Sequence, residues 1–335
     1  MKYFFYTCFG ILITGLSLAV AFSFFVPSYI QKKIKSSVRE SCDSCYFEAG
    51  NVAISVFSPQ LWVFHDLRFT GGNPEVSSYD VHIDEVALDV NLRMLWDQHL
   101  HIARLHITNP TVTMTEGEKR SEGNREKTLK FKVENIRLTN GTFTYVRNYK
   151  GTHALLHMTN VEAKTQIFGN EEDLAGKPLI VNSSLVLEQS GKIDLDIYTY
   201  IIPEGPLTVD ANIRIKDQDL GKLTSFFRPN AGVILEGKML SGIGTAKVRG
   251  TTLDAAVTST FKDLRIRVEK EVERSSIEAF FENIGIALDV NKENVSKSAE
   301  DRTRKVTITR EPEERVVGFI LRGLKEAALK VARAD

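Results

Sequence analysis

The feature that most constrains the fold is a strict alternation of apolar and polar residues. Two long runs show it, with apolar residues at Val86, Leu88, Val90 and Leu92, and at Leu207, Val209, Ala211, Ile213 and Ile215. Successive side chains of a strand point to opposite faces of a sheet, so each run predicts a strand with one apolar face. Shorter runs predict further strands at 52–56, 102–107, 112–114, 136–145, 161–167, 184–187, 193–198 and 257–268.

Turn signals separate several of these runs. They are Gly71-Gly72, Asn109-Pro110, Asn140-Gly141, Gly191 and the segment Pro203-Glu204-Gly205-Pro206. Asn-Gly between two alternating runs is typical of a two-residue hairpin, so a chain reversal is expected at Asn140-Gly141. The segment 116–127 is charged and contains no apolar residue, which indicates a solvent-exposed loop. The economical topology is an antiparallel meander.

Few helices are expected. Residues 217–227 begin with acidic residues, carry apolar residues at helical spacing and precede Pro229. Ser275 or Ser276 is placed to cap a second helix over 277–290. A third, amphipathic helix is predicted over 311–333, with acids at its start, bases at its end and apolar residues on one side, namely Val317, Ile320, Leu321, Leu324, Ala328 and Val331.

The N-terminus carries an uncharged, apolar run from Tyr3 to Val26. As a helix at ~1.5 Å per residue it is long enough for the ~30 Å hydrocarbon layer of a membrane. A cleaved signal peptide is the rival interpretation, because Ala19-Val20-Ala21 has the A-x-A form, but the apolar run continues past it. We expect four parts: an anchor at 1–28, a basic linker at 29–48, a β-rich domain at 49–268 and a C-terminal helical region at 269–335.

Charge gives limited guidance on compartment and partner. The 43 basic and 43 acidic residues cancel, so no electrostatic excess favours nucleic acid, and none is expected as a partner. Lys32, Lys33, Lys35 and Arg39 follow the apolar run, which by the positive-inside rule places the following chain in the cytoplasm. Long domains are translocated largely regardless of such charges, so this argument does not decide the compartment.

Cysteine and histidine supply the candidate ligands. Cys42 and Cys45 form one C-x-x-C pair without a second pair, which favours either a local disulfide or two free thiols over a zinc site. His99 and His101 would share one face of a strand and are a conceivable metal pair, although the apolar residues around them fit an ordinary sheet face. No metal site is assigned.

Motifs of catalysis are missing from the sequence. It contains no G-x-S-x-G, H-E-x-x-H or Walker P-loop, and no G-x-G-x-x-G after a strand. We therefore expect a non-enzymatic protein with no catalytic residues and no cofactor.

Three successive segments carry a family resemblance. They are 57–72, with Pro59, Leu67 and Phe69; 81–95, with Val86, Leu88, Val90, Leu92 and Leu95; and 100–114, with Ile102, Leu105, Ile107, Pro110 and Val112. Together with the N-terminal apolar run, their order resembles the AsmA-like family of bacterial envelope proteins, which looks related to chorein-type, repeating β-groove lipid-transfer proteins. The good match covers about residues 1 to 115. Arg147-Asn148 stands where the family often has an acidic residue.

The resemblance implies a single-pass anchor in a bacterial inner membrane with the body in the periplasm. It also implies a mainly β fold, coiled into an elongated groove that binds phospholipid acyl chains and supports envelope lipid transport or outer-membrane homeostasis. Periodicity alone leaves a groove and a filled sandwich equally open, since both cover one apolar sheet face. The groove candidates are Val86, Leu88, Val90, Leu92, Ile102, Leu207, Val209, Ala211, Ile213 and Ile215. The alternative is a structural or assembly protein that binds another envelope protein.

Overall fold

The computed structural model describes residues 45–55, 58–73, 77–91, 100–116, 131–149, 152–169, 174–200, 207–268, 302–311 and 316–332. It also describes single residues or pairs between 28 and 36, between 294 and 298, and at 93, 171 and 314. The expected anchor run Tyr3 to Val26 and the expected helix at 277–290 lie outside the described residues.

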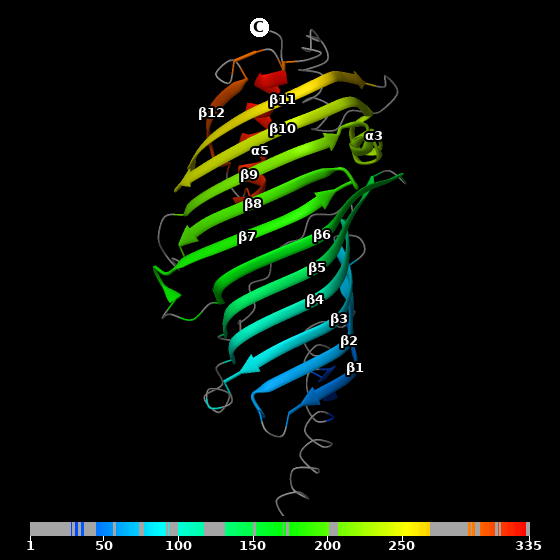
Figure 1. Cartoon of the computed structure of the whole chain (residues 1–335), viewed down its shortest axis with the longest axis vertical. Coiled ribbons are helices and arrows are strands. Elements are labelled where there is room, and N and C mark those ends of the chain that lie inside the picture. Colours follow the sequence, from blue (N-terminus) through cyan, green and yellow to red (C-terminus); the bar gives the residue numbers. More distant parts are fainter. Residues whose placement is uncertain are drawn as a thin grey trace, which may run out of the picture.

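The described chain forms one mainly β sheet of 12 strands whose spatial order is their order in the sequence (Figure 1). The strands are β1 Tyr46–Ile54, β2 Leu61–Asn73, β3 Ser77–Val90, β4 Leu100–Glu116, β5 Phe131–Tyr149, β6 Thr152–Gly169, β7 Pro178–Leu187, β8 Gly191–Tyr200, β9 Thr208–Asp219, β10 Val233–Arg249, β11 Thr252–Val268 and β12 Thr303–Thr309. The expected meander is confirmed, with β4 and β5 as the one parallel pair among otherwise antiparallel neighbours in the sheet described.

Helical segments follow β9 and β12. The 3₁₀ turn η2 Gly221–Leu223 leads into α3 Thr224–Ala231, and α5 Val316–Ala332 follows β12. Helix α5 confirms the expected amphipathic helix, but its predicted apolar side is wrong in part. Val317, Leu321 and Ala328 are exposed, and the buried side carries Phe319, Gly323, Ala327 and Val331. Strand β12 lies in the C-terminal region that was expected to be helical. The helix expected over 217–227 was misplaced, because Asp217 to Asp219 belong to β9 and Pro229 lies inside α3. Within the described residues, no helix is both long and apolar enough to cross a membrane.

The predicted hairpin at Asn140-Gly141 is wrong. A two-residue hairpin of this type needs positive φ at both residues. Asn140 has φ 52°, but Gly141 is not among the positive-φ residues, so the chain continues along β5. Asn109-Pro110 likewise lies inside β4. Gly71-Gly72 lies inside β2, just before the reversal that pairs Asn73 with Ser77.

Two other predicted turn positions do lie in or next to turns. Glu188 to Ser190 form the turn before Gly191, as expected. Pro59 lies in a turn, and β2 begins two residues later at Leu61. Residues 203–206 lie outside the described part of the chain.

A recurrent local pattern bends the strands instead of reversing them. In seven described places an apolar residue is followed by any residue, then by Asn or Asp with φ between 48° and 57°, at Asp66, Asn109, Asn135, Asn140, Asn160, Asp217 and Asp263. Asn and Asp tolerate this left-handed conformation better than other non-glycine residues. Each adds a residue to the alternation, so the apolar side chains on both sides of it stay on one face of the sheet.

The bends of neighbouring strands coincide along a line that we call the crease. It comprises Gly50, Asp66, Asp84, Asn109, Asn140 and Glu162, at matching positions of β1 to β6. The side-chain amide of Asn109 donates to the Asp84 carboxylate over 2.9 Å, and that of Asn140 donates to the side-chain oxygen of Asn109 over 2.8 Å. The backbone N–H of Asn140 donates to the Glu162 carboxylate over 2.9 Å. Polar side chains therefore link neighbouring strands along the crease, and at Asn140 a carboxylate accepts the backbone N–H.

Candidate functional site

The apolar face of the sheet is continuous from strand to strand. The register joins one residue of each strand from β1 to β11 in a first row: Val52, Phe64, Val86, Ile107, Leu138, Ala163, Ser183, Leu195, Ile213, Gly244 and Val257. On β12 the residue opposite Val257 is Arg304. A second row crosses all twelve strands: Ile54, Trp62, Leu88, Leu105, Ile136, Thr165, Val181, Ile197, Ala211, Ala246, Ala255 and Val306. In these two rows Ser183 and Thr165 are the residues with a hydroxyl group, and Trp62 donates its indole N–H to the Pro59 carbonyl oxygen.

Burial divides this face into three parts. At the N-terminal end, Val52, Ile54, Phe64 and Val86 form a buried cluster. At the C-terminal end, Val209, Ala211, Ala246, Val248, Leu253, Ala255 and Val306 are buried together with residues of α5. Between them, the row residues of β4 to β8 are only partly buried. The middle of the apolar face is therefore the part that remains accessible.

Helix α5 covers the C-terminal part, packing on β10, β11 and β12 (Figure 1). Phe319 and Ala327 are fully buried against the sheet. Gly323 permits the close approach, because a Cβ there would lie 2.5 Å from Cδ2 of Leu253. One end of the face is thus closed by this chain itself.

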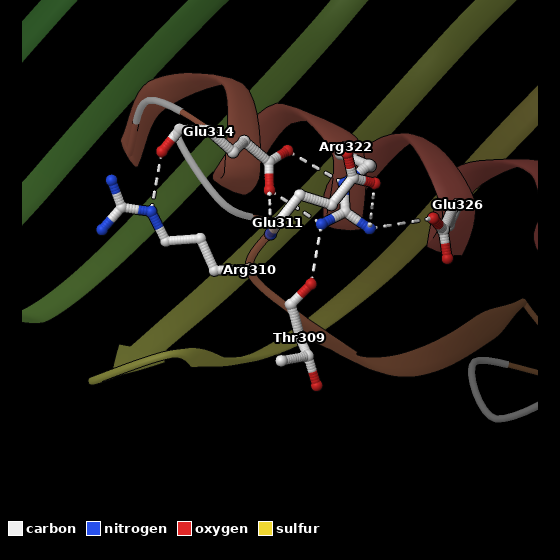
Figure 2. A network of polar contacts seen from close by, with 6 residues as sticks. All are labelled: Thr309, Arg310, Glu311, Glu314, Arg322 and Glu326. Carbon is white, nitrogen blue, oxygen red and sulfur yellow. Dashed lines mark hydrogen bonds and ion pairs between the residues drawn. The ribbon is translucent and has the colours of Figure 1, made fainter.

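A polar network fastens the start of α5, as Figure 2 shows. Arg322 donates to both carboxylate oxygens of Glu314, over 2.9 and 2.8 Å, and to the backbone oxygen of Thr309. It also lies 5.5 Å from the ring centroid of Phe319. The hydrogen bonds from Arg322 hold the pKa of Glu314 below its usual value. The network links the helix to the end of β12.

Helix α3 lies at one rim, where it packs on β6 and β10 and reaches β5. The rings of Phe226 on α3 and Tyr145 on β5 are 6.0 Å apart between centroids. Burial, followed by a hydrogen bond to Glu116, raises the pKa of Tyr145 well above its usual value, so its hydroxyl stays protonated. A short helix thus spans from β10 to strands that come much earlier in the sheet.

The structure separates the ten predicted groove residues into groups. Val86, Leu88, Ile102 and Val90 lie on the face at its N-terminal part, with Val90 only 2% exposed. Val209 and Ala211 are buried in the cluster beneath α5, and Leu207, which is partly buried, packs against that cluster. Ile213 and Ile215 are partly buried next to the open middle, and Leu92 lies outside the described residues.

Sequence reasoning missed the centre of the face. Ile107, Leu138 and Leu195 were inside predicted strands but were not named as candidates. In β8 the alternation around Leu195 is uninterrupted. Next to Ile107 and Leu138, Asn bends interrupt the alternation, which hid that the same face continues. The spacing of apolar, any, Asn or Asp, apolar is the signal that locates these residues.

The cysteine and histidine candidates are placed only in part. Cys45 is disulfide-bonded, while Cys42 and His99 lie outside the described residues. A Cβ on Gly71 would lie 2.4 Å from Sγ of Cys45, so this glycine leaves room for the disulfide. His101 lies 3.4 Å from a Glu134 oxygen, and His106 lies 3.2 Å from the Thr139 hydroxyl. Among the residues described, no three His, Cys, Asp or Glu side chains are grouped as a metal would require.

Comparisons with known proteins give no family for the chain. No protein-family model matches it, and no curated protein matches it.

Proposed function

We propose that the protein is a non-enzymatic, membrane-anchored component of a bacterial envelope that binds lipid acyl chains along the apolar face of its sheet. The observation that supports this most is the pair of cross-strand rows, which are partly exposed from β4 to β8. Burying acyl surface there gains roughly 25 cal/mol per Å², which offsets extraction of the chain from a bilayer.

The dimensions fit this ligand. Strands are ~4.8 Å apart, so the five strands from β4 to β8 give a stretch of roughly 19 Å. One acyl chain in a leaflet occupies about half of the ~30 Å hydrocarbon layer. The accessible stretch is therefore long enough for one acyl chain, and the full sheet, at roughly 53 Å between its edges, suits a lipid carrier or a part of a longer conduit.

Two isoleucines provide a matched test. Ile213 lies in the first row, whereas Ile243 is 50% exposed and, paired with Arg214, points to the opposite face. A photo-crosslinking amino acid is placed at either position in the full chain, in cells labelled with a radioactive fatty acid. The groove predicts labelled lipid adducts at position 213 and none at 243.

The alternative function gives a different result. If the face docks a protein, crosslinking at position 213 yields a protein adduct without lipid, and the chain is a structural or assembly factor. Equal lipid labelling at both positions also contradicts the groove, because it reports general membrane contact.

A further inference from the structure

The face opposite the apolar rows carries mostly complementary charges across neighbouring strands. Arg104 pairs with Asp89 at 2.7 Å, Arg249 with Asp210 at 2.8 Å and Arg214 with Asp196 at 2.7 Å. Such pairs are the usual stabilising arrangement of an exposed sheet face.

Two positions depart from this rule, and the first lies on β5 and β6. Arg137 on β5 lies directly opposite Lys164 on β6, and His106 lies opposite Arg137 on β4. Like charges directly opposite each other destabilise a sheet. Neither Arg137 nor Lys164 forms a hydrogen bond or an ion pair with any residue the structure describes. Both side chains are exposed, and the charge of Lys164 adds to the causes that lower the pKa of Asp196.

These two cations line a hollow of about 510 Å³ across β5 to β9. Its acidic residues are already engaged: Asp196 by Asn182 and Arg214, Asp194 by Arg214 at 4.0 Å, and Glu162 by the Asn140 amide. The hydrogen bond from Asn182, and then that from Arg214, hold the pKa of Asp196 below its usual value. Of the residues that line the hollow, Arg137, Lys164 and Ser184 offer hydrogen-bond donors that form no hydrogen bond or ion pair with the described residues, so these donors are free to bind a ligand.

A second like-charged pair lies outside the hollow and separates the effect of charge from the effect of the concave surface. Lys192 on β8 lies directly opposite Lys216 on β9, and neither residue lines the hollow. The pair has the same charge but lacks the concave surface and the hydroxyl. It therefore serves as an internal control for electrostatic attraction alone.

We propose that the hollow is a binding site for a phosphate group, held between Arg137 and Lys164 with Ser184 as a further donor. A guanidinium offers a planar, two-pronged set of donors that matches phosphate oxygens, and an ammonium adds a compact charge. The phosphate comes either from a soluble compound or from a lipid headgroup. The site lies on the face opposite the acyl rows, so it does not rest on the proposed function.

The test is calorimetric titration of the full chain in detergent with two probes. Inorganic phosphate represents the soluble source, and glycerophosphoglycerol, a lipid headgroup without acyl chains, represents the membrane source. We expect saturable binding that falls at least tenfold in Arg137→Gln/Lys164→Gln and is retained in Lys192→Gln/Lys216→Gln. The Arg137→Lys variant keeps the charge and should bind more weakly than wild type but better than the double variant.

The outcomes separate the two sources. Tighter binding of the headgroup assigns the site to lipid, and tighter binding of inorganic phosphate assigns it to a soluble phosphate. Absence of saturable binding of either probe, or an equal loss in the two double variants, overturns the proposal. The substituted residues are exposed and their removal relieves repulsion, so an unchanged or raised unfolding midpoint verifies that the variants are folded.

Discussion

The C-terminal and central parts of the apolar face are built from the same alternating strands but end in different states. At the C-terminal end, Ala246, Val248 and Leu253 have no exposed surface because α5 covers them. In the centre, Leu138, Leu195 and Ile213 continue the same row and remain partly exposed. The apolar face of a strand therefore does not determine which segment will bury it. In this sheet α5, which is distant in sequence from most strands, buries the face at the C-terminal end only.

The largest predicted effect compares two phenylalanines. Phe319 of α5 is fully buried, whereas Phe168 of β6 is 49% exposed. Phe319→Ala should lower the free energy of unfolding by about 3–5 kcal/mol, since it leaves a cavity under the helix. Phe168→Ala should cost only about 1 kcal/mol, mainly through its ring contact with Phe131. Denaturant unfolding of both variants measures this, and equal losses would mean that α5 does not close the core.

The second prediction uses two glycines of α5. A Cβ at Gly323 meets Leu253, whereas a Cβ at Gly318 meets nothing within 4 Å. Gly323→Ala should destabilise by about 1–3 kcal/mol through overpacking. Gly318→Ala should stabilise by about 0.5–1 kcal/mol, because alanine favours the helix. Thermal unfolding gives the sign of each change, and a common sign would contradict the close docking of the helix.

The third prediction concerns the crease, which shapes the N-terminal half of the sheet and part of its open centre. Asn109 has φ 50°, so Asn109→Ala should cost about 1–2 kcal/mol, including the lost hydrogen bond to Asp84. Asn109→Gly loses the same hydrogen bond but tolerates the backbone, and should cost less. Unfolding midpoints that fall equally in both variants would show that the conformation at Asn109 carries no strain.

The smallest effect concerns the fastening of α5 and is pH-dependent. The pKa of Glu314 is lowered from 4.5 in the fold, so the Arg322 interaction stabilises the protein above about pH 4.5. That contribution, on the order of 1 kcal/mol, is lost as the pH falls through the lower folded pKa. The difference in unfolding midpoint between wild type and Glu314→Gln should therefore shrink on acidification. A difference that is constant from pH 7 to pH 3 would contradict this origin.

Prediction from sequence succeeded where the signal was local. The alternation of Val86 to Val90 and of Leu207 to Ile215 gave strands, and the spacing of Ile320, Leu324 and Val331 gave α5, although Val317 and Leu321 of the predicted apolar side are exposed. It failed at Asn140 and Asn109, because one Asn residue with positive φ serves either a hairpin or a bend, and the neighbouring strands decide which. The candidate site was found in outline only, since Val209 and Ala211 look the same in sequence as Ile213 does.

The sequence by itself determined a mainly β chain with one apolar face per strand and an amphipathic helix near its C-terminal end, because side-chain periodicity depends on neighbouring residues alone. Tertiary structure decided the rest: the parallel pairing of β4 with β5, the alignment of bends into a crease, and the cover of α5 over β10 to β12. These features depend on contacts between residues far apart in the chain. The physical reason is that an apolar face requires burial, but the two-residue period of a strand does not determine which segment or ligand buries that face.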